Sequence, residues 1–226
     1  MTLLDAFVHD KFGAAVVERL QDEHRINLRD WRQAWAPSTW TDNAVVLLVS
    51  GTGDPRLEAF VNQVSFDVGR DWMPVVLEPR YLRVGPVVTS GGNGCFECFR
   101  LRQLQHKWST DSDVFIEAAR ASGLAYIREA SGYLPSHIDI AASLASRALQ
   151  EINRRRSDEN ERGEGPWPVV YRSGLSYTRV EEIRITPVHN CSVCSPASRQ
   201  RMGEATSVER LQALSRRINT AAAARS

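Results

Sequence analysis

Apolar residues recur at intervals of three and four positions through the first twenty residues of the chain. They are Leu4, Phe7, Val8, Phe12, Ala15, Val16 and Leu20. This spacing places them on one side of a helix, in spite of Gly13, which is a poor helix former. The pattern predicts an amphipathic helix over residues 4–21.

A different pattern begins at residue 44. Residues 44–49, AVVLLV, form a continuous aliphatic run, and SGTGDP follows it. Such a run bounded by glycines is typical of a strand buried on both faces, as in a parallel sheet covered by helices. Pro55 then opens a segment, residues 55–68, whose apolar positions have helical spacing. The sequence therefore predicts a strand, a turn and a helix in succession, as in an α/β fold.

The rest of the chain contains further sequence patterns of strands and helices. We expect strands in WMPVVLEP and YLRVGPVV, helices over 99–108, 111–123, 136–156 and 206–224, an exposed loop over 157–166 and a hairpin within 168–187. The segment 136–156 carries a clear helix signal, because it starts with a capping serine and ends in three arginines that match the helix dipole.

Three tryptophans lie within ten residues, at positions 31, 35 and 40. Clustered rings usually serve as anchors of a core or of an interface. Polar residues between them make the segment too irregular to bury all three rings on one face. We expect at least two rings to pack over the chain's own sheet, and we expect the segment 31–40 to contribute to a contact with a partner.

Composition narrows the classes of function. The 226 residues include 28 Lys and Arg against 27 Asp and Glu, so the net charge is only +1 at pH 7. A general nucleic-acid-binding protein usually carries a strong basic excess, so we expect no nucleic-acid partner. The N-terminus lacks the features of a signal peptide, and no apolar run reaches the roughly 18 to 20 residues that span a bilayer. We therefore expect a cytoplasmic protein with no membrane partner.

All four cysteines of the chain lie in two Cys-x-x-Cys pairs, Cys95 with Cys98 and Cys191 with Cys194. In a reducing compartment, paired cysteines favour metal or redox chemistry over structural disulfides. Two tight knuckles can together form a tetrahedral site, for which Zn²⁺ is the default metal. A site closed by four thiolates leaves no coordination position for a substrate. The sequence therefore predicts a structural zinc ion held by these four residues.

The other interpretations of the cysteines are weaker. A thioredoxin-like dithiol needs only one pair, and an iron–sulfur cluster more often draws three cysteines from one closely spaced run. Chance pairing is a further alternative. His189 could also be a metal ligand, but four thiolates already complete the shell.

Taken together, these motifs resemble a known family. The order of buried strand, GTGDP turn, helix with Asn62, two further strands, glycine-rich Cys-x-x-Cys and distant second Cys-x-x-Cys resembles the ubiquitin-activating-enzyme-like (ThiF and MccB type) superfamily. The stretch RVGPVVTSGGNGCFECFRLRQ is similar to the partner proteins of thiazole/oxazole-modified microcin (TOMM) cyclodehydratases. The resemblance covers residues 44–195. It implies an α/β fold with a degenerate, Rossmann-type sheet, flanking helices and a pair of zinc knuckles.

The sequence departs from this family where nucleotides bind. Activating enzymes hold ATP on a Gly-x-Gly-x-x-Gly turn after the first strand, and no such glycine pattern precedes residue 44. Ser50 stands where the family's aspartate is expected, and Gly51 with Gly53 alone is weak evidence for phosphate binding. No cysteine remains for catalysis once all four are assigned to a metal. We therefore predict no catalytic and no cofactor-binding residue in this chain.

The resemblance implies an accessory subunit. Such a protein gathers a ribosomal precursor peptide and stimulates a YcaO-type enzyme, which uses ATP to activate a backbone amide so that Cys, Ser or Thr closes to an azoline. A second hypothesis is an active adenylyltransferase that couples AMP to a peptide or carrier-protein carboxylate. A third, a zinc-ribbon nucleic-acid module, is disfavoured by the near-neutral charge.

We divide the chain into three parts on these grounds. Residues 1–43 form an N-terminal helical and Trp-rich segment, residues 44–200 a ThiF-like zinc-bearing domain, and residues 201–226 a C-terminal helical tail. The resemblance is also compatible with a homo-oligomer.

Overall fold

The structure, a computed structural model, describes residues 2–78, 81–90, 92–105, 132–157, 168–175 and 179–195. Its strands are β1 (Leu3–Val8), β2 (Arg25–Asp30), β3 (Val45–Ser50), β4 (Trp72–Leu77), β5 (Tyr81–Val84), β6 (Val169–Gly174) and β7 (Val180–Arg184). Its helices are α1 (Lys11–Leu20), α2 (Pro55–Val68), α3 (Phe96–Gln105) and α5 (Pro135–Ser157), with short 3-10 turns η1 (Trp31–Trp35) and η2 (Pro37–Thr39). The predicted helices over 111–123 and 206–224, and residues 158–166 of the predicted loop, lie outside the described residues.

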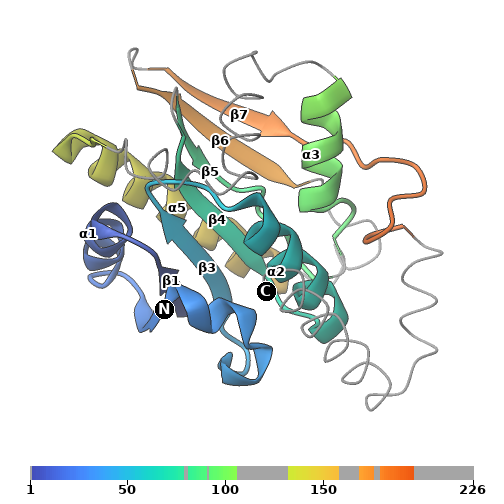
Figure 1. The fold of residues 1–226 in the computed structure, drawn as a ribbon, viewed down its shortest axis with the longest axis horizontal. Coiled ribbons are helices and arrows are strands. Elements are labelled where there is room, and N and C mark those ends of the chain that lie inside the picture. Colours follow the sequence, from blue (N-terminus) through green and yellow to red (C-terminus); the bar gives the residue numbers. More distant parts are fainter. Residues whose placement is uncertain are drawn as a thin grey trace, which may run out of the picture.

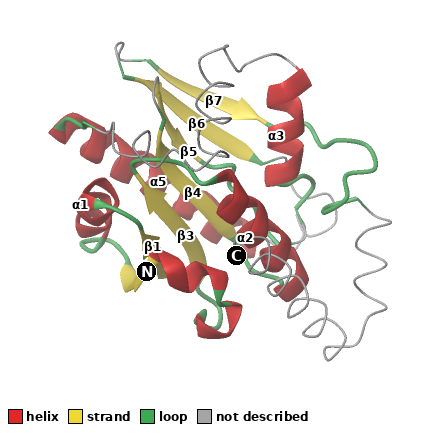
Figure 2. Ribbon diagram, viewed as in Figure 1, coloured by secondary structure: helices red, strands yellow, loops and turns green. Residues whose placement is uncertain are grey.

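The seven strands form one sheet in the order β2-β1-β3-β4-β5-β6-β7 (Figure 1). The first four strands in this order are parallel, whereas β5, β6 and β7 each pair antiparallel with their neighbours. Parallel neighbours need crossover connections, and α1 and α2 supply two of them. Helices lie on both faces of the sheet (Figure 2). The prediction of a Rossmann-type sheet with flanking helices is confirmed.

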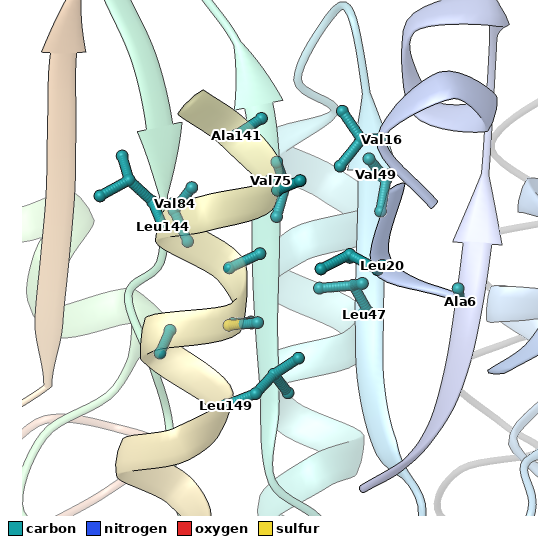
Figure 3. Close-up of a cluster of buried hydrophobic side chains, with 14 of the residues drawn as sticks. Ala6, Val16, Leu20, Leu47, Val49, Val75, Val84, Ala141, Leu144 and Leu149 are labelled. Carbon is teal, nitrogen blue, oxygen red and sulfur yellow. The ribbon is translucent and has the colours of Figure 1, made fainter. Parts of the chain in front are cut away.

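Each face of the sheet has its own hydrophobic core. On one face, α1 and α5 pack against the strands, and Ala141, Leu144 and Leu149 of α5 point toward the sheet (Figure 3). On the other face, α2 and α3 pack with η1 in a second core. All six residues of β3 are buried, because alternate side chains enter the two cores. The continuous apolar run 44–49 therefore forms the doubly buried strand that was predicted.

Helix α2 follows its predicted bounds, and its ends have a local cause. The Asp54 carboxylate accepts hydrogen bonds from the backbone N–H groups of Arg56 and Leu57, and Pro55 occupies the first turn. Gly69 ends the helix in the left-handed conformation, with φ of 67°. None of the described helices combines the length and apolarity needed to cross a bilayer.

The predicted helix over residues 4–21 is wrong in its first half. Residues 3–8 form β1, and only Lys11–Leu20 are helical. Leu4 and Ala6 enter one core while Phe7 enters the other, so the side chains alternate as in a strand. The short segment LLDAFV is compatible with the spacing of a helix or of a strand. Its pairing with β2 and β3 on its two sides makes it a strand. The sheet consequently extends across the boundary that we predicted at residue 43.

The Trp-rich segment lies on the sheet. Trp31 and Trp40 are buried in the second core, so the expectation that at least two rings pack on their own chain is confirmed. Trp35 is partly buried and packs against Phe60 of α2, with ring centroids 4.8 Å apart. The preceding strand β2 was not predicted, because its alternating polar sequence, RINLRD, belongs to an edge strand that buries little.

Candidate functional site

The first cysteine pair lies at the start of α3. Gly94 precedes it with φ of 109°, and a Cβ atom there would lie 2.8 Å from Pro168 Cδ, so only glycine fits this approach. The amide N–H of Phe96, between the two cysteines, donates to Asn62 Oδ1 of α2 over 3.0 Å. The Phe99 N–H donates to the Cys95 carbonyl, which closes the first turn. The pair is thus a knuckle whose backbone is held by α2.

The second pair follows β7, on a segment that runs beside α3 (Figure 1). The Val188 N–H donates to Cys98 Sγ over 3.3 Å, so the approach to the second pair contacts the first. Arg102 of α3 donates to the carbonyls of Thr186 and Pro187. These contacts join the two cysteine segments.

The four sulfur atoms form one buried cluster. The Sγ–Sγ distances are 4.0 Å for Cys95 to Cys98, 3.7 Å for Cys95 to Cys191 and 3.4 Å for Cys98 to Cys194. All four ligand atoms lie within 4.8 Å of one another, and none of the cysteines forms a disulfide. Four sulfurs arranged tetrahedrally at 2.3 Å from a Zn²⁺ ion would be about 3.8 Å apart. The donor set therefore fits a four-thiolate zinc ion in number, distance and burial.

Hydrogen bonds among the four thiols shift their pKa values in opposite directions. Hydrogen bonding to Cys191 raises the pKa of the Cys95 and Cys194 thiols, and burial adds to both shifts. Hydrogen bonding from Cys194 lowers the pKa of Cys191. The thiols thus share their protons unequally, and only a positive charge among them allows all four to ionise together. His189 is exposed and lies outside this group.

A buried ion pair fixes α2 beside the first knuckle. Arg83 of β5 donates to both carboxylate oxygens of Glu58, at 3.1 and 2.8 Å, and its guanidinium lies over the Phe99 ring at 5.4 Å. Burial raises the pKa of Glu58 to about 7, although Arg83 favours the charged form. Together with the hydrogen bond that Asn62 accepts from Phe96, the contact of Arg83 with Phe99 holds α3 at two points.

We did not predict from the sequence that Glu58, Arg83 and Arg102 hold the segments that carry the cysteines. For Glu58 the signal was present, because Glu58 and Asn62 are polar residues one helical turn apart among the buried positions of α2. Arg83 and Arg102 gave no comparable signal.

The turn between β1 and α1 is a second candidate site. From β1 the chain continues to β2, which pairs with one edge of β1, and then to β3, which pairs with the other edge. Helices α1 and α2 lie on opposite faces of the sheet. The topological switch point of the sheet therefore lies between β1 and β3. Ligands of open α/β sheets usually bind at this point, beyond the carboxyl ends of the strands. This turn is not visible in the sequence pattern, because the spacing of apolar residues predicts one helix over residues 4–21.

The Asp10 carboxylate lies at the switch point. Its Oδ1 accepts from the Gly13 N–H at 2.9 Å, and its Oδ2 accepts from the Gly51 N–H at 2.6 Å. His9 Nδ1 lies 3.6 Å from Oδ2. Burial alone would raise the pKa of Asp10, but these donors hold it below its ordinary value. The carboxylate is therefore stably charged in this position.

Comparison with known proteins identifies the fold. No family model and no curated protein matches the sequence. Among solved structures, a heterocyclase in complex with substrate and cofactor superimposes on 87% of this chain with a TM-score of 0.61 and 15% identity. The heterocyclase TruD superimposes on 86% with a TM-score of 0.58 and 15% identity, and E. coli MccB with ATP on 76% with a TM-score of 0.52 and 12% identity.

The chain has a ThiF/MccB-like fold. It spans 26% and 27% of the two heterocyclase chains and 45% of the MccB chain, so it corresponds to one part of each. At these identities the likeness establishes the ThiF/MccB-like fold alone, and the resemblance seen in the sequence is confirmed at that level.

Proposed function

We propose that this chain is a non-catalytic or degenerate ThiF-like partner subunit of an ATP-dependent peptide cyclodehydratase. In this role it binds or presents a ribosomal precursor peptide to a YcaO-type enzyme, which forms azolines during biosynthesis of a ribosomally made and modified peptide (RiPP). The observation that carries the proposal is the superposition of 87% of the chain on 26% of a heterocyclase in complex with substrate and cofactor. The chain supplies one part of such an enzyme, and a partner supplies the part that uses ATP.

The chain's own residues support a role without chemistry. All four of its cysteines lie in the buried cluster, so none is free to act as a nucleophile. The Asp10 carboxylate lies at the switch point of the sheet, where it would repel the phosphates of a nucleotide.

Cys95, Cys98, Cys191 and Cys194 would hold the zinc ion. A four-thiolate zinc ion supplies structural cross-linking and no open coordination position. It would join α3 to the segment that follows β7 and so fix the surface that these two segments present. That surface is a candidate contact for the partner enzyme or the peptide.

Reconstitution tests this role. The purified chain, the YcaO-type enzyme and the Cys/Ser/Thr-rich peptide from neighbouring genes are mixed with Mg–ATP, and mass spectrometry follows the peptide. Each azoline removes one water molecule, and we expect this loss to require both proteins. Equal processing without this chain, or no binding of the chain to either component, would contradict the proposal.

An active adenylyltransferase is the alternative, and the superposition on MccB with ATP favours it. Calorimetry with Mg–ATP and an assay for pyrophosphate release distinguish the two roles. We expect neither tight binding nor pyrophosphate from the isolated chain. Micromolar binding of ATP would support the adenylyltransferase.

A further inference from the structure

The β1–α1 turn has the backbone of a phosphate-binding turn. In the Gly-x-Gly-x-x-Gly arrangement, the second glycine lets the phosphate approach the helix N-terminus, and the third lets the helix pack closely on a strand. The corresponding positions here are Val8, Asp10 and Gly13. Gly13 retains the packing role, because a Cβ atom on it would lie 2.6 Å from the Val49 carbonyl oxygen. Asp10 stands in the place of the second glycine.

The Asp10 side chain does more than cap its own helix. Its two oxygens accept from Gly13 of α1 and from Gly51, which follows β3, and the Ser50 hydroxyl lies 3.3 Å from Oδ2. The N-cap of α2 provides a contrast, because within the described residues the Asp54 carboxylate accepts from its own first turn alone, from Arg56 and Leu57. The Asp10 carboxylate thus accepts from the first turn of α1 and from the end of β3, on the two sides of the switch point.

We infer that Asp10 is a built-in substitute for a bound phosphate, and that it closes the switch point of this sheet to phosphate-bearing ligands. A carboxylate has the same sign of charge as a phosphate and accepts from the same kind of donors, the amides at a helix N-terminus and a neighbouring turn. The fold therefore keeps an anion at this position without a nucleotide.

This inference stands apart from the proposed role in peptide modification. A chain that failed to stimulate any cyclodehydratase could still hold Asp10 in this way, and a chain that did stimulate one could still bind phosphate. The two proposals therefore fail separately.

The test compares wild type with Asp10→Gly, which restores the second glycine, and with Asp54→Gly, which removes the N-cap carboxylate of α2. The full-length chain is melted with increasing inorganic pyrophosphate, and with sodium chloride at equal ionic strength. We expect Asp10→Gly to melt at a lower temperature than wild type in buffer and to be stabilised saturably by pyrophosphate. A tenfold excess over the dissociation constant should raise its Tm by about 3 to 6 °C.

Wild type and Asp54→Gly should show no stabilisation by pyrophosphate beyond that of sodium chloride. Equal stabilisation of wild type and Asp10→Gly would overturn the inference, because the site would then be open in the native protein. A folded Asp10→Gly that responds no more than Asp54→Gly would overturn it as well.

A second variant covers the case in which Asp10→Gly does not fold. Asp10→Asn keeps the shape of the side chain and removes its charge. Because a neutral acceptor makes weaker hydrogen bonds, the amide proton resonances of both Gly13 and Gly51 should move upfield from their wild-type positions. An unchanged resonance for either amide would show that the carboxylate does not join the two segments.

Discussion

Replacing Asn62 by alanine should weaken both the fold and the cysteine cluster. The Asn62 side chain is 1% exposed, and its oxygen is the acceptor for the Phe96 N–H at the start of α3. A buried donor left without its acceptor costs about 1 to 3 kcal/mol. For a chain of this length, a loss of about 2 kcal/mol lowers the Tm by roughly 4 to 8 °C.

The same change should lower zinc affinity, because Phe96 lies between Cys95 and Cys98. Loss of a group that orients metal ligands typically costs about 10- to 100-fold in affinity. Thermal melting and competition with a coloured chelator measure the two effects. Ser65→Ala is the matched control, since Ser65 is buried on the same helix and its hydroxyl has no partner within the described part of the chain. If Asn62→Ala behaved like this control in both assays, the assigned role of the Asn62 to Phe96 bond would be wrong.

Three further predictions concern other parts of the molecule. Metal analysis should find one zinc ion per chain, and chelation should lower the Tm, because structural zinc contributes on the order of 10 kcal/mol in small domains; near-zero zinc with unchanged melting would contradict the site. Burial lowers the pKa of His24 below its ordinary value of 6.5, so its contribution to stability should be complete above that pH and decline as the pH falls. His24→Leu should then flatten the dependence of Tm on pH from about 7 to about 5, and an unchanged slope would exclude His24 as the cause. Trp35→Ala should reduce partner affinity in a binding assay with little change in Tm. The Trp40 ring is buried, so Trp40→Ala should cost about 3 to 5 kcal/mol of stability. If Trp35→Ala lowered the Tm and left partner affinity unchanged, Trp35 would be excluded from the interface.

The elements that were predicted correctly are those whose local pattern permits only one structure. The aliphatic run 44–49, the capped segment 55–68 and the long segment 136–156 each became the expected strand or helix. The hairpin within 168–187 also formed, as β6 and β7. The helix after the first cysteine pair begins at Phe96, three residues before the predicted start, because the knuckle itself is part of its first turn.

The errors lie where local pattern is ambiguous. Residues 3–8 fit a helix as well as a strand by spacing, and only pairing with two parallel neighbours decided between them. The edge strand β2 has too few buried residues to give an apolar pattern in the sequence. Because β1 was missed, so was the turn that carries Asp10, and with it the second candidate site.

The sequence by itself determined the fold class, the pairing of the cysteines and the resemblance to ThiF and MccB type proteins, because these depend on residue type and spacing. It could not show that the four sulfurs lie within 4.8 Å of one another, because Cys98 and Cys191 are far apart in the chain and meet only after β6 and β7 have joined the sheet. Nor could it place the Asp10 carboxylate on the Gly51 amide, since that contact requires β1 and β3 to lie side by side. Long-range contacts of this kind are consequences of strand order, and strand order is decided by the packing of the whole sheet.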